Sequence, residues 1–215
     1  FMLCTSSLFS SIFPILQMLI AELPLVHREH RAGAYDPATH LLSKMLADAP
    51  LEFLPPLLLT TVVFGLVGFR DDEGAGGWRH LGGFAACVEA VTFAGSSMGY
   101  AIAAAAPDLA TGALLTPMMV FPCILLGGLY ANTGNIPQYY AWFNHINPLH
   151  YGFVALSHIQ WEHYPDIACD AALPIECPFV DGKSVLAFYS LDGHGTGAVR
   201  SICLLLVIGA CYRAL

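Results

Sequence analysis

Three short patterns in this 215-residue chain combine residue types that could do chemistry. The first, Gly95-Ser96-Ser97-Met98-Gly99, matches the G-x-S-x-G sequence that presents a nucleophilic serine in esterases. That chemistry needs a strand before the serine and a helix after it. The flanking residues Thr92-Phe93-Ala94 and Ala101–Ala106 instead favour the interior of a helix. We therefore interpret this pattern as small residues that let two helices approach closely.

The other two patterns resemble ligand-binding motifs incompletely. His27-Arg28-Glu29-His30 has the residues of a zinc-protease helix, but its histidines are three apart rather than four. Gly182-Lys183-Ser184 resembles the end of a phosphate-binding loop, but Cys177 occupies the position of the required first glycine. Four other histidines are more suggestive of a metal cluster, but interfacial hydrogen bonding is the preferred interpretation: His145, His150, His158 and His163. We predict no catalytic, metal or nucleotide site in this chain.

The acidic residues and cysteines give three further expectations. Glu89 is the one acid well inside a predicted membrane span, where a carboxylate is costly and indicates a substrate contact or an interhelical hydrogen bond. Glu52 is expected to be a solvated charge near the membrane surface. Cys169 and Cys177 are the only close cysteine pair and are a plausible intramolecular disulfide. The other cysteines lie in apolar stretches and are expected to be buried free thiols: Cys4, Cys87, Cys123, Cys203 and Cys211.

The composition indicates which solvent surrounds these residues. Hydrophobic residues make up 56% of the chain and charged residues 11%, against roughly 25% charged in an ordinary soluble domain. The mean hydropathy is +0.62. We therefore expect a membrane protein, and the net charge of −8 excludes a basic nucleic-acid-binding surface. The chain begins and ends inside apolar runs, which indicates a piece of a longer protein.

The elements that must position these residues are predicted to be membrane-spanning helices in an all-α polytopic bundle. A span needs about 20 apolar residues. Five stretches qualify: Phe1–Ala21, Leu51–Phe69, Leu81–Ala106, Leu109–Tyr130 and Ala198–Leu215.

Two of the segments between the spans are long. In residues 22–50, Asp36-Pro37 is a helix start, and the helix after it is amphipathic, with Lys44 and Asp48 on its polar face. Residues 131–197 form a long loop that opens with a short aromatic helix, Gln138 to His145. Basic residues divide evenly between the two sides, so charge does not orient the chain. A disulfide in the long loop would place that loop outside and His27–Arg31 in the cytoplasm.

In their order and spacing, these residues resemble the membrane domain of ABC transporter subfamily G, the White and breast-cancer-resistance-protein group. One part of the resemblance is Ser96-Ser97 in a span, preceded by a series of mostly charged residues: Glu22, Arg28-Glu29, Gly33, Tyr35, Lys44 and Asp48. The other part runs from Gly128-Leu129-Tyr130-Ala131-Asn132 through Trp142 to Pro148-x-x-Tyr151-Gly152-Phe153. The resemblance covers nearly the whole chain, from the end of the family's second span to its sixth, so five of six spans are expected.

The resemblance implies a half-transporter that exports apolar or amphipathic molecules, such as lipids, sterols or xenobiotics, by alternating access. ATP and Mg would be bound by an upstream nucleotide-binding domain that is absent from this chain, and a second half-transporter would complete a homo- or heterodimer. The protein would be a multi-pass component of the plasma membrane or an organelle membrane. The full protein would hydrolyse ATP, although this chain would carry no ATPase site.

The resemblance also assigns roles to individual residues. Leu129 and Tyr130 would form a gate above the substrate cavity, with tyrosine where the family has leucine, and Cys169 and Cys177 match the family's intramolecular bridge. The coupling element that rests on the ATPase would include Glu22, Arg28, Glu29, Gly33 and Tyr35. The substrate cavity would be lined by Ser10, Phe13, Pro117, Phe121 and Ile124, to which we add Glu89.

Two alternatives from other classes stay open. One is an intramembrane hydrolase that uses Ser97 or the histidines. The other is a channel-like or scaffold subunit of the membrane without an ATPase. The upstream sequence distinguishes them, because an exporter requires a Walker A motif and an ABC signature there.

Overall fold

The computed structural model describes residues 1–33, 35–68, 76–132, 137–162, 167, 179, 181–191 and 197–214. These residues form helices joined by turns, which confirms the predicted all-α membrane bundle. The helices are α1 (Met2–Arg31), α2 (Pro37–Val67), α3 (Gly76–Ala105), α4 (Leu109–Leu125), α5 (Gln138–Asn144), α6 (Pro148–Trp161), α7 (Gly182–Phe188) and α8 (Ala198–Ala214).

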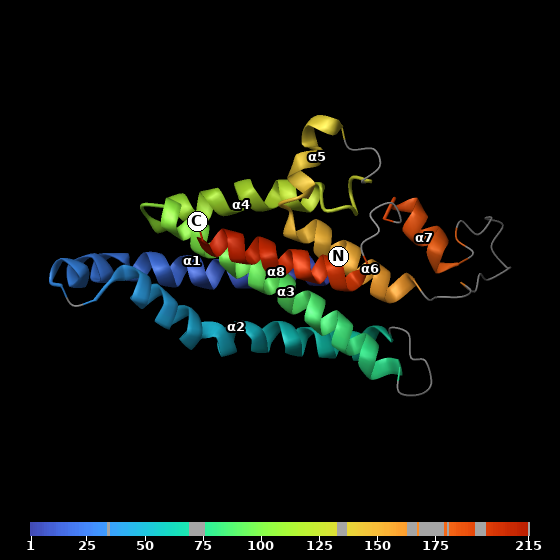
Figure 1. Cartoon of the computed structure of the whole chain (residues 1–215), viewed down its shortest axis with the longest axis horizontal. Helices are drawn as coiled ribbons and strands as arrows, with labels where there is room; N and C mark the ends of the chain where they lie inside the picture. The colour runs from blue at the N-terminus through green and yellow to red at the C-terminus, as the bar shows by residue number, and fades with distance from the viewer. Residues whose placement is uncertain are drawn as a thin grey trace.

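Among the residues that the structure describes, three helices are long and apolar enough to cross a membrane: α1, α2 from Ala38, and α3 from His80. α4 is a shorter apolar helix, and it and α8 have 17 residues each. α1 and α2 are longer than predicted, because the segment between the first two spans continues both helices rather than forming a separate one. The residues expected to connect two spans are therefore the ends of α1 and α2 (Figure 1).

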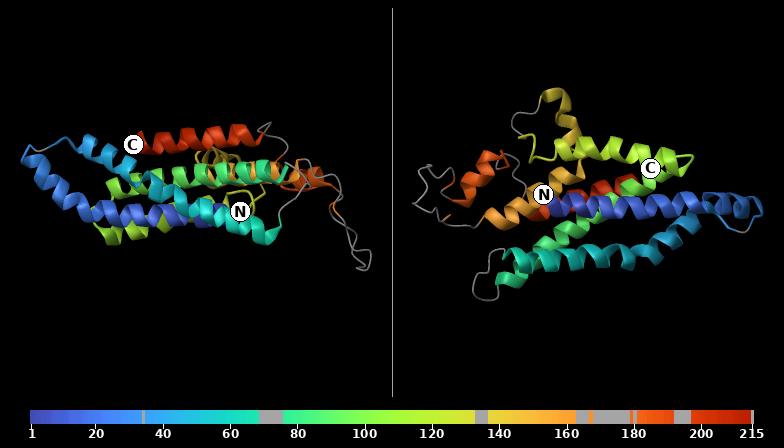
Figure 2. Two further views of the ribbon diagram at one scale, coloured as in Figure 1. Left: turned by 90° about the horizontal axis from the view of Figure 1, so that it is seen from below. Right: turned by 180° about the vertical axis from the view of Figure 1, so that it is seen from behind.

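α3 is the centre of the bundle, and α1 and α8 pack along it (Figures 1 and 2). The small residues of α3 explain the close approach to α1. A Cβ atom at Gly95 would collide with Ser11 Oγ, and one at Gly99 would lie 3.2 Å from the carbonyl oxygen of Ile12. The predicted role of the G-x-S-x-G residues in helix packing is thus confirmed.

The outward side of α2 carries large apolar side chains. Leu54, Leu58, Val62 and Leu66 are all more than half exposed. Since exposed leucine and valine of this density are stable in hydrocarbon, this side faces lipid. α2 bends part-way along its length (Figure 1). It contains Pro50, Pro55 and Pro56, which cannot donate helical hydrogen bonds and are a common cause of such bends.

The first part of the expected long loop returns to the bundle. The predicted aromatic helix is present as α5, and α6 then packs against α3 and α8 with its first two turns buried. Asn147 fixes the start of α6, because its side chain accepts a hydrogen bond from Leu149 N and donates one to the carbonyl oxygen of Cys123 (both 3.0 Å). α7 begins with a capping box formed by Asp181 and Ser184, so Ser184 is a helix-capping residue rather than part of a phosphate-binding loop.

Candidate functional site

Five side chains join the end of α1 to the start of α2, and we call Glu22, Glu29, Tyr35, His40 and Lys44 the α1–α2 corner. Lys44 Nζ donates to Glu22 Oε1, and His40 Nε2 lies 3.7 Å from Glu22 Oε2. The Tyr35 hydroxyl donates to Glu29 Oε2, and the Tyr35 ring stacks on His40 with 5.2 Å between centroids. These contacts hold the two helix ends as one unit.

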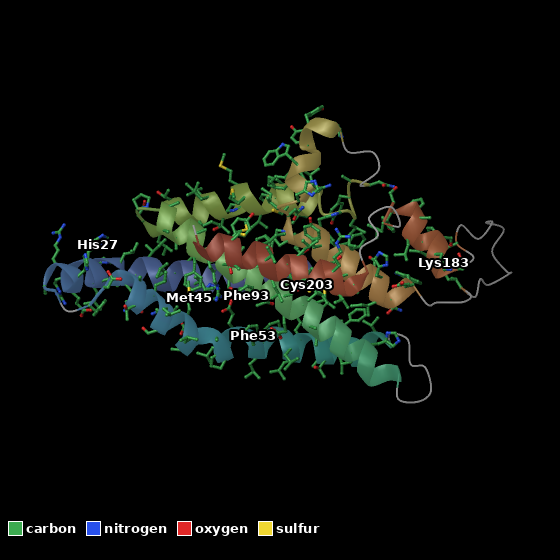
Figure 3. The ribbon with its side chains drawn as sticks, viewed as in Figure 1. His27, Met45, Phe53, Phe93, Lys183 and Cys203 are labelled. Atoms are coloured by element: carbon green, nitrogen blue, oxygen red, sulfur yellow. The ribbon has the colours of Figure 1, made fainter. Side chains whose placement is uncertain are left out.

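The chemistry of the α1–α2 corner follows from the Tyr35–Glu29 hydrogen bond. Donation to a carboxylate favours the protonated phenol, and this bond raises the pKa of Tyr35 above its usual value. The corner also lies at the opposite end of the bundle from α7, as the positions of His27 and Lys183 show (Figure 3). One end of the protein therefore presents a cluster of charged residues of both signs.

The remaining predicted coupling residues are in the same place. Gly33 follows α1 with a φ of +73°, a left-handed conformation that glycine adopts without strain, and so allows the chain to turn towards α2. Arg28 is exposed in the last turn of α1. Glu29 and Tyr35 are thus in direct contact, and Glu22 is linked to Tyr35 through His40. Arg28 and Gly33 lie in the same segment of the chain. His40 and Lys44 were not among the predicted coupling residues, although their spacing of four places them on one helical face.

A second polar cluster lies between α2, α3 and α8. Arg213 of α8 donates from Nε to Ser97 Oγ (3.0 Å) and from Nη2 to Ser96 Oγ (3.1 Å), and Nη2 lies 3.7 Å from Glu52 Oε2. The guanidinium also stacks 4.3 Å above the centroid of the Phe93 ring. The expectation for Glu52 was therefore wrong, because its side chain is only 10% exposed and faces Arg213.

These contacts also bear on the hydrolase alternative. Ser97 lies in the interior of α3, and its hydroxyl donates to the carbonyl oxygen of Phe93 (2.6 Å) and accepts from Arg213. A nucleophilic serine needs a base within hydrogen-bond reach, whereas Ser97 contacts a carbonyl oxygen and a guanidinium. Among the described residues, no group of three or more histidines, cysteines and acids could hold a metal ion. His163 lies outside the described residues.

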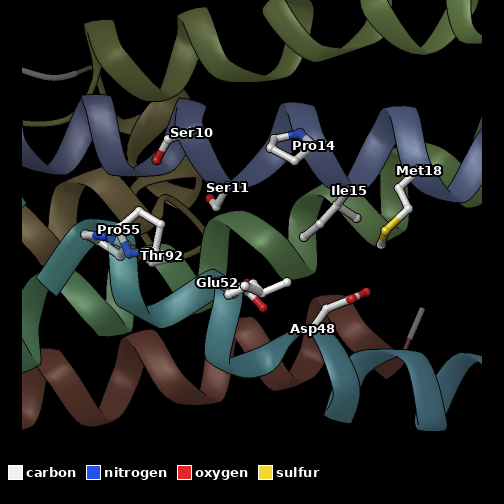
Figure 4. Close-up of a pocket in the computed structure, with 11 residues that line it drawn as sticks. Ser10, Ser11, Pro14, Ile15, Met18, Asp48, Glu52, Pro55 and Thr92 are labelled. Atoms are coloured by element: carbon white, nitrogen blue, oxygen red, sulfur yellow. The ribbon is translucent and has the colours of Figure 1, made fainter. Parts of the chain in front are cut away.

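A cavity of about 250 Å³ separates α1 from α2 beside α3 (Figure 4). Ser10, Ser11, Ile15 and Met18 line it from α1, and Asp48 and Glu52 from α2. Ser10 is the one predicted cavity residue among its lining side chains.

The other predicted cavity residues lie elsewhere. Phe13 and Phe121 are 38% and 60% exposed, Pro117 is half-buried, and Ile124 packs partly against the core. Within this chain they do not surround one space with Ser10, so their shared role stays a prediction. Glu89 lies on α3, and both of its carboxylate oxygens are buried without a hydrogen-bond partner among the described residues.

The predicted gate lies in a turn rather than in a helix. α4 ends at Leu125, because Gly127 packs against Phe1 and Gly128 adopts a φ of +106°. Tyr130 is 65% exposed and contacts the Phe1 ring edge-on at 5.7 Å. Leu129 lines a cavity of about 410 Å³ together with side chains of α6 and α7. The predicted disulfide partners Cys169 and Cys177 lie outside the described residues, and their bridge stays a prediction.

The sequence profile of the ABC-2 type transporter family matches residues 1–161. The chain belongs to this family. Its similarity to White and other subfamily G proteins identifies it as a subfamily G transmembrane domain and thus as an integral membrane protein. The resemblance that we drew from the sequence is therefore confirmed.

The relatives are longer proteins. The chain is 28% identical to Protein white of Drosophila melanogaster over 188 residues, which are 86% of this chain and 26% of that protein. It is 28% identical to the ABC transporter ATP-binding protein/permease wht-1 of Caenorhabditis elegans over 191 residues, 88% of this chain and 26% of the relative. It is 26% identical to the broad substrate specificity ATP-binding cassette transporter ABCG2 of Mus musculus over 162 residues, 75% of this chain and 24% of the relative. The chain thus spans about a quarter of the length of these relatives.

Proposed function

We propose that this chain is the transport domain of an ATP-driven exporter of apolar or amphipathic molecules, such as lipids, sterols or xenobiotics. The names of two relatives describe ATP-binding transporters, and one of these describes broad substrate specificity. The nucleotide-binding domain, with its ATP and Mg, would be a separate part of the same polypeptide. A second half-transporter would complete the transport pathway.

The observation that carries this proposal is the α1–α2 corner. A carboxylate, a lysine and an exposed arginine at the end of a membrane helix are unstable in hydrocarbon, so they must face water or a protein surface. Glu22–Lys44 joins α1 to α2 directly, and Tyr35 bonds to Glu29 of α1 while it stacks on His40 of α2. A force applied to this end would therefore move both helices as one body. Residues 22–50 would therefore be the coupling region, and residues 131–197 the outer region.

The substrate would cross between two copies of the domain. Exposed aromatic side chains on α1 and α4, those of Phe13 and Phe121, support such an interface, because they leave apolar surface uncovered in a single chain. Ser10, Pro117, Ile124 and Glu89 would complete the lining. Leu129 and Tyr130 would close the outer end of this pathway.

Coupling is tested in the full-length transporter by measuring substrate-stimulated ATP hydrolysis and substrate binding. We expect Glu29→Ala and Arg28→Ala to remove the stimulation while substrate binding persists. Lys183→Ala and Glu162→Ala, at the other end of the bundle, are the matched controls and should behave as wild type. Normal stimulation in both corner variants would show that coupling occurs elsewhere, and an upstream sequence without a Walker A motif would favour the scaffold alternative.

A further inference from the structure

The α1–α2 cavity combines an apolar wall with acidic groups. Ile15, Met18 and Pro14 of α1 face Leu51 and Pro55 of α2 across it. Figure 4 shows Ser11, Ile15 and Met18 pointing from α1 towards α2, and Glu52 and Asp48 on the side of α2 that faces them. The cavity volume is about 250 Å³. This is slightly below the value of about 300 Å³ at which the range for small-molecule sites begins.

The two acids at this cavity have unused acceptor atoms. Asp48 Oδ2 and Glu52 Oε1 are both buried, and neither accepts a hydrogen bond from any residue that the structure describes. The Glu52 side chain is only 10% exposed, and Arg213 lies near its other oxygen, Oε2. A buried carboxylate oxygen without a partner is costly, so a donor that enters this cavity would be favoured.

The surrounding positive charges are already engaged. Arg213 also donates to Ser96 and Ser97, and Lys44, one turn before Asp48, donates to Glu22. Two carboxylates therefore line the cavity, and the guanidinium of Arg213 lies beside the carboxylate of Glu52, which leaves a net negative charge. An anionic ligand would be repelled, and a neutral one would leave this charge unbalanced.

The prolines add further acceptors. A proline cannot donate to the carbonyl group four residues earlier. Pro14, Pro55 and Pro56 consequently leave three carbonyl groups without their regular helical donor, those of Ser10, Leu51 and Glu52. All three belong to residues that line the cavity. The residues around the cavity thus carry several acceptors that lack a regular donor, which suits a ligand with several N–H donors.

We propose that the α1–α2 cavity binds a small organic ammonium ion, with its N–H groups on Asp48 and Glu52 and an apolar body between Ile15, Met18 and Pro55. The site lies within one chain and shares only Ser10 with the cavity proposed between two copies. The proposal goes beyond the exporter function, because it requires neither ATP hydrolysis nor the partner copy.

The test is equilibrium binding of radiolabelled 2-phenylethylammonium to the full-length protein in lipid nanodiscs without ATP. We expect saturable binding, with competition by unlabelled 2-phenylethylammonium and at least tenfold weaker competition by 2-phenylethanol and phenylacetate, which have the same ring without the positive charge. The trimethylammonium analogue, which has the charge without N–H donors, should also compete less well. Equal competition by the alcohol would overturn the proposal.

Variants locate the site. Asp48→Asn and Glu52→Gln should each weaken binding about tenfold or more, whereas Glu162→Gln on the distant end of α6 should leave it unchanged. Because Glu52→Gln also removes the contact with Arg213 and could impair folding, Ser10→Leu fills the cavity while keeping both carboxylates, and should abolish binding. Wild-type affinity in both Asp48→Asn and Ser10→Leu would contradict the site. Since no step uses ATP, a failure here is distinct from a failure of the coupling experiment.

Discussion

Glu22 and Lys44 form an ion pair between α1 and α2 although 22 positions separate them in the sequence. Their side chains are 33% and 15% exposed, so the pair is partly shielded from water. The contact directs the polar face of the first turns of α2 towards α1 and leaves Leu42 and Leu46, which are 60% and 69% exposed, on the outside. It is therefore the central contact of the proposed coupling region.

Charge reversal tests this pair. Lys44→Glu places two carboxylates together and should lower the free energy of unfolding by about 1 kcal/mol. The unfolding temperature and the substrate-stimulated ATPase activity should both fall. The double variant Glu22→Lys/Lys44→Glu restores opposite charges and should recover most of both. If the double variant is no better than the single one, the ion pair does not join the helices.

The Tyr35–Glu29 hydrogen bond predicts a pH dependence on the alkaline side. The folded-state pKa of Tyr35 is raised by this bond, so its contribution to stability is fully present below the unfolded value of about 10 and is lost as the pH rises through the folded value. The measurement is the ¹³Cζ resonance of labelled tyrosine, assigned by its loss in Tyr35→Phe. Glu29→Gln should move this titration back towards 10. A Tyr35 titration at the ordinary pKa in the wild-type protein would contradict the contact.

The gate predicts a change in basal activity. Removing the ring in Tyr130→Ala takes away its edge-on contact with Phe1 and should loosen the turn after α4. We expect raised basal ATPase activity and shorter substrate retention in the full-length protein, with larger effects in Leu129→Ala and in the double variant. Tyr139→Ala, an exposed aromatic residue on α5, is the control. Assembly of the dimer should not change in these variants. If basal activity, substrate retention and transport are all at wild-type values in Tyr130→Ala, the gate lies elsewhere.

Helix packing predicts a contrast between two glycines. A Cβ atom at Gly209 of α8 would lie 2.6 Å from Cδ1 of Phe93, whereas one at Gly82 of α3 meets nothing within 4 Å. Gly209→Ala should therefore destabilise the protein by about 1–3 kcal/mol. Gly82→Ala should be neutral or slightly stabilising, because alanine favours a helix. Thermal unfolding of the two variants in the same detergent measures the difference, and equal unfolding temperatures would contradict the packing of α8 on α3.

The sequence predicted the features that depend on local composition and spacing. Apolar runs predicted the helices, Asp36-Pro37 predicted the start of α2, and the small residues around Ser96-Ser97 predicted a close helix contact. The order of charged residues from Glu22 to Asp48 also identified the family. These signals are readable because a membrane requires long apolar helices and because capping and small-residue packing use neighbouring positions.

The tertiary structure decided which polar groups meet. Glu52 was expected in water, but the fold places it against Arg213, 161 positions later in the chain, and beside a cavity that local patterns do not reveal. The same holds for Lys44, whose partner Glu22 lies on another helix. Helical periodicity tells which residues share a face of one helix, but the partner of that face depends on how α1, α2, α3 and α8 pack. The pairing of charges inside this bundle is therefore a property of the packed helices rather than of any single segment.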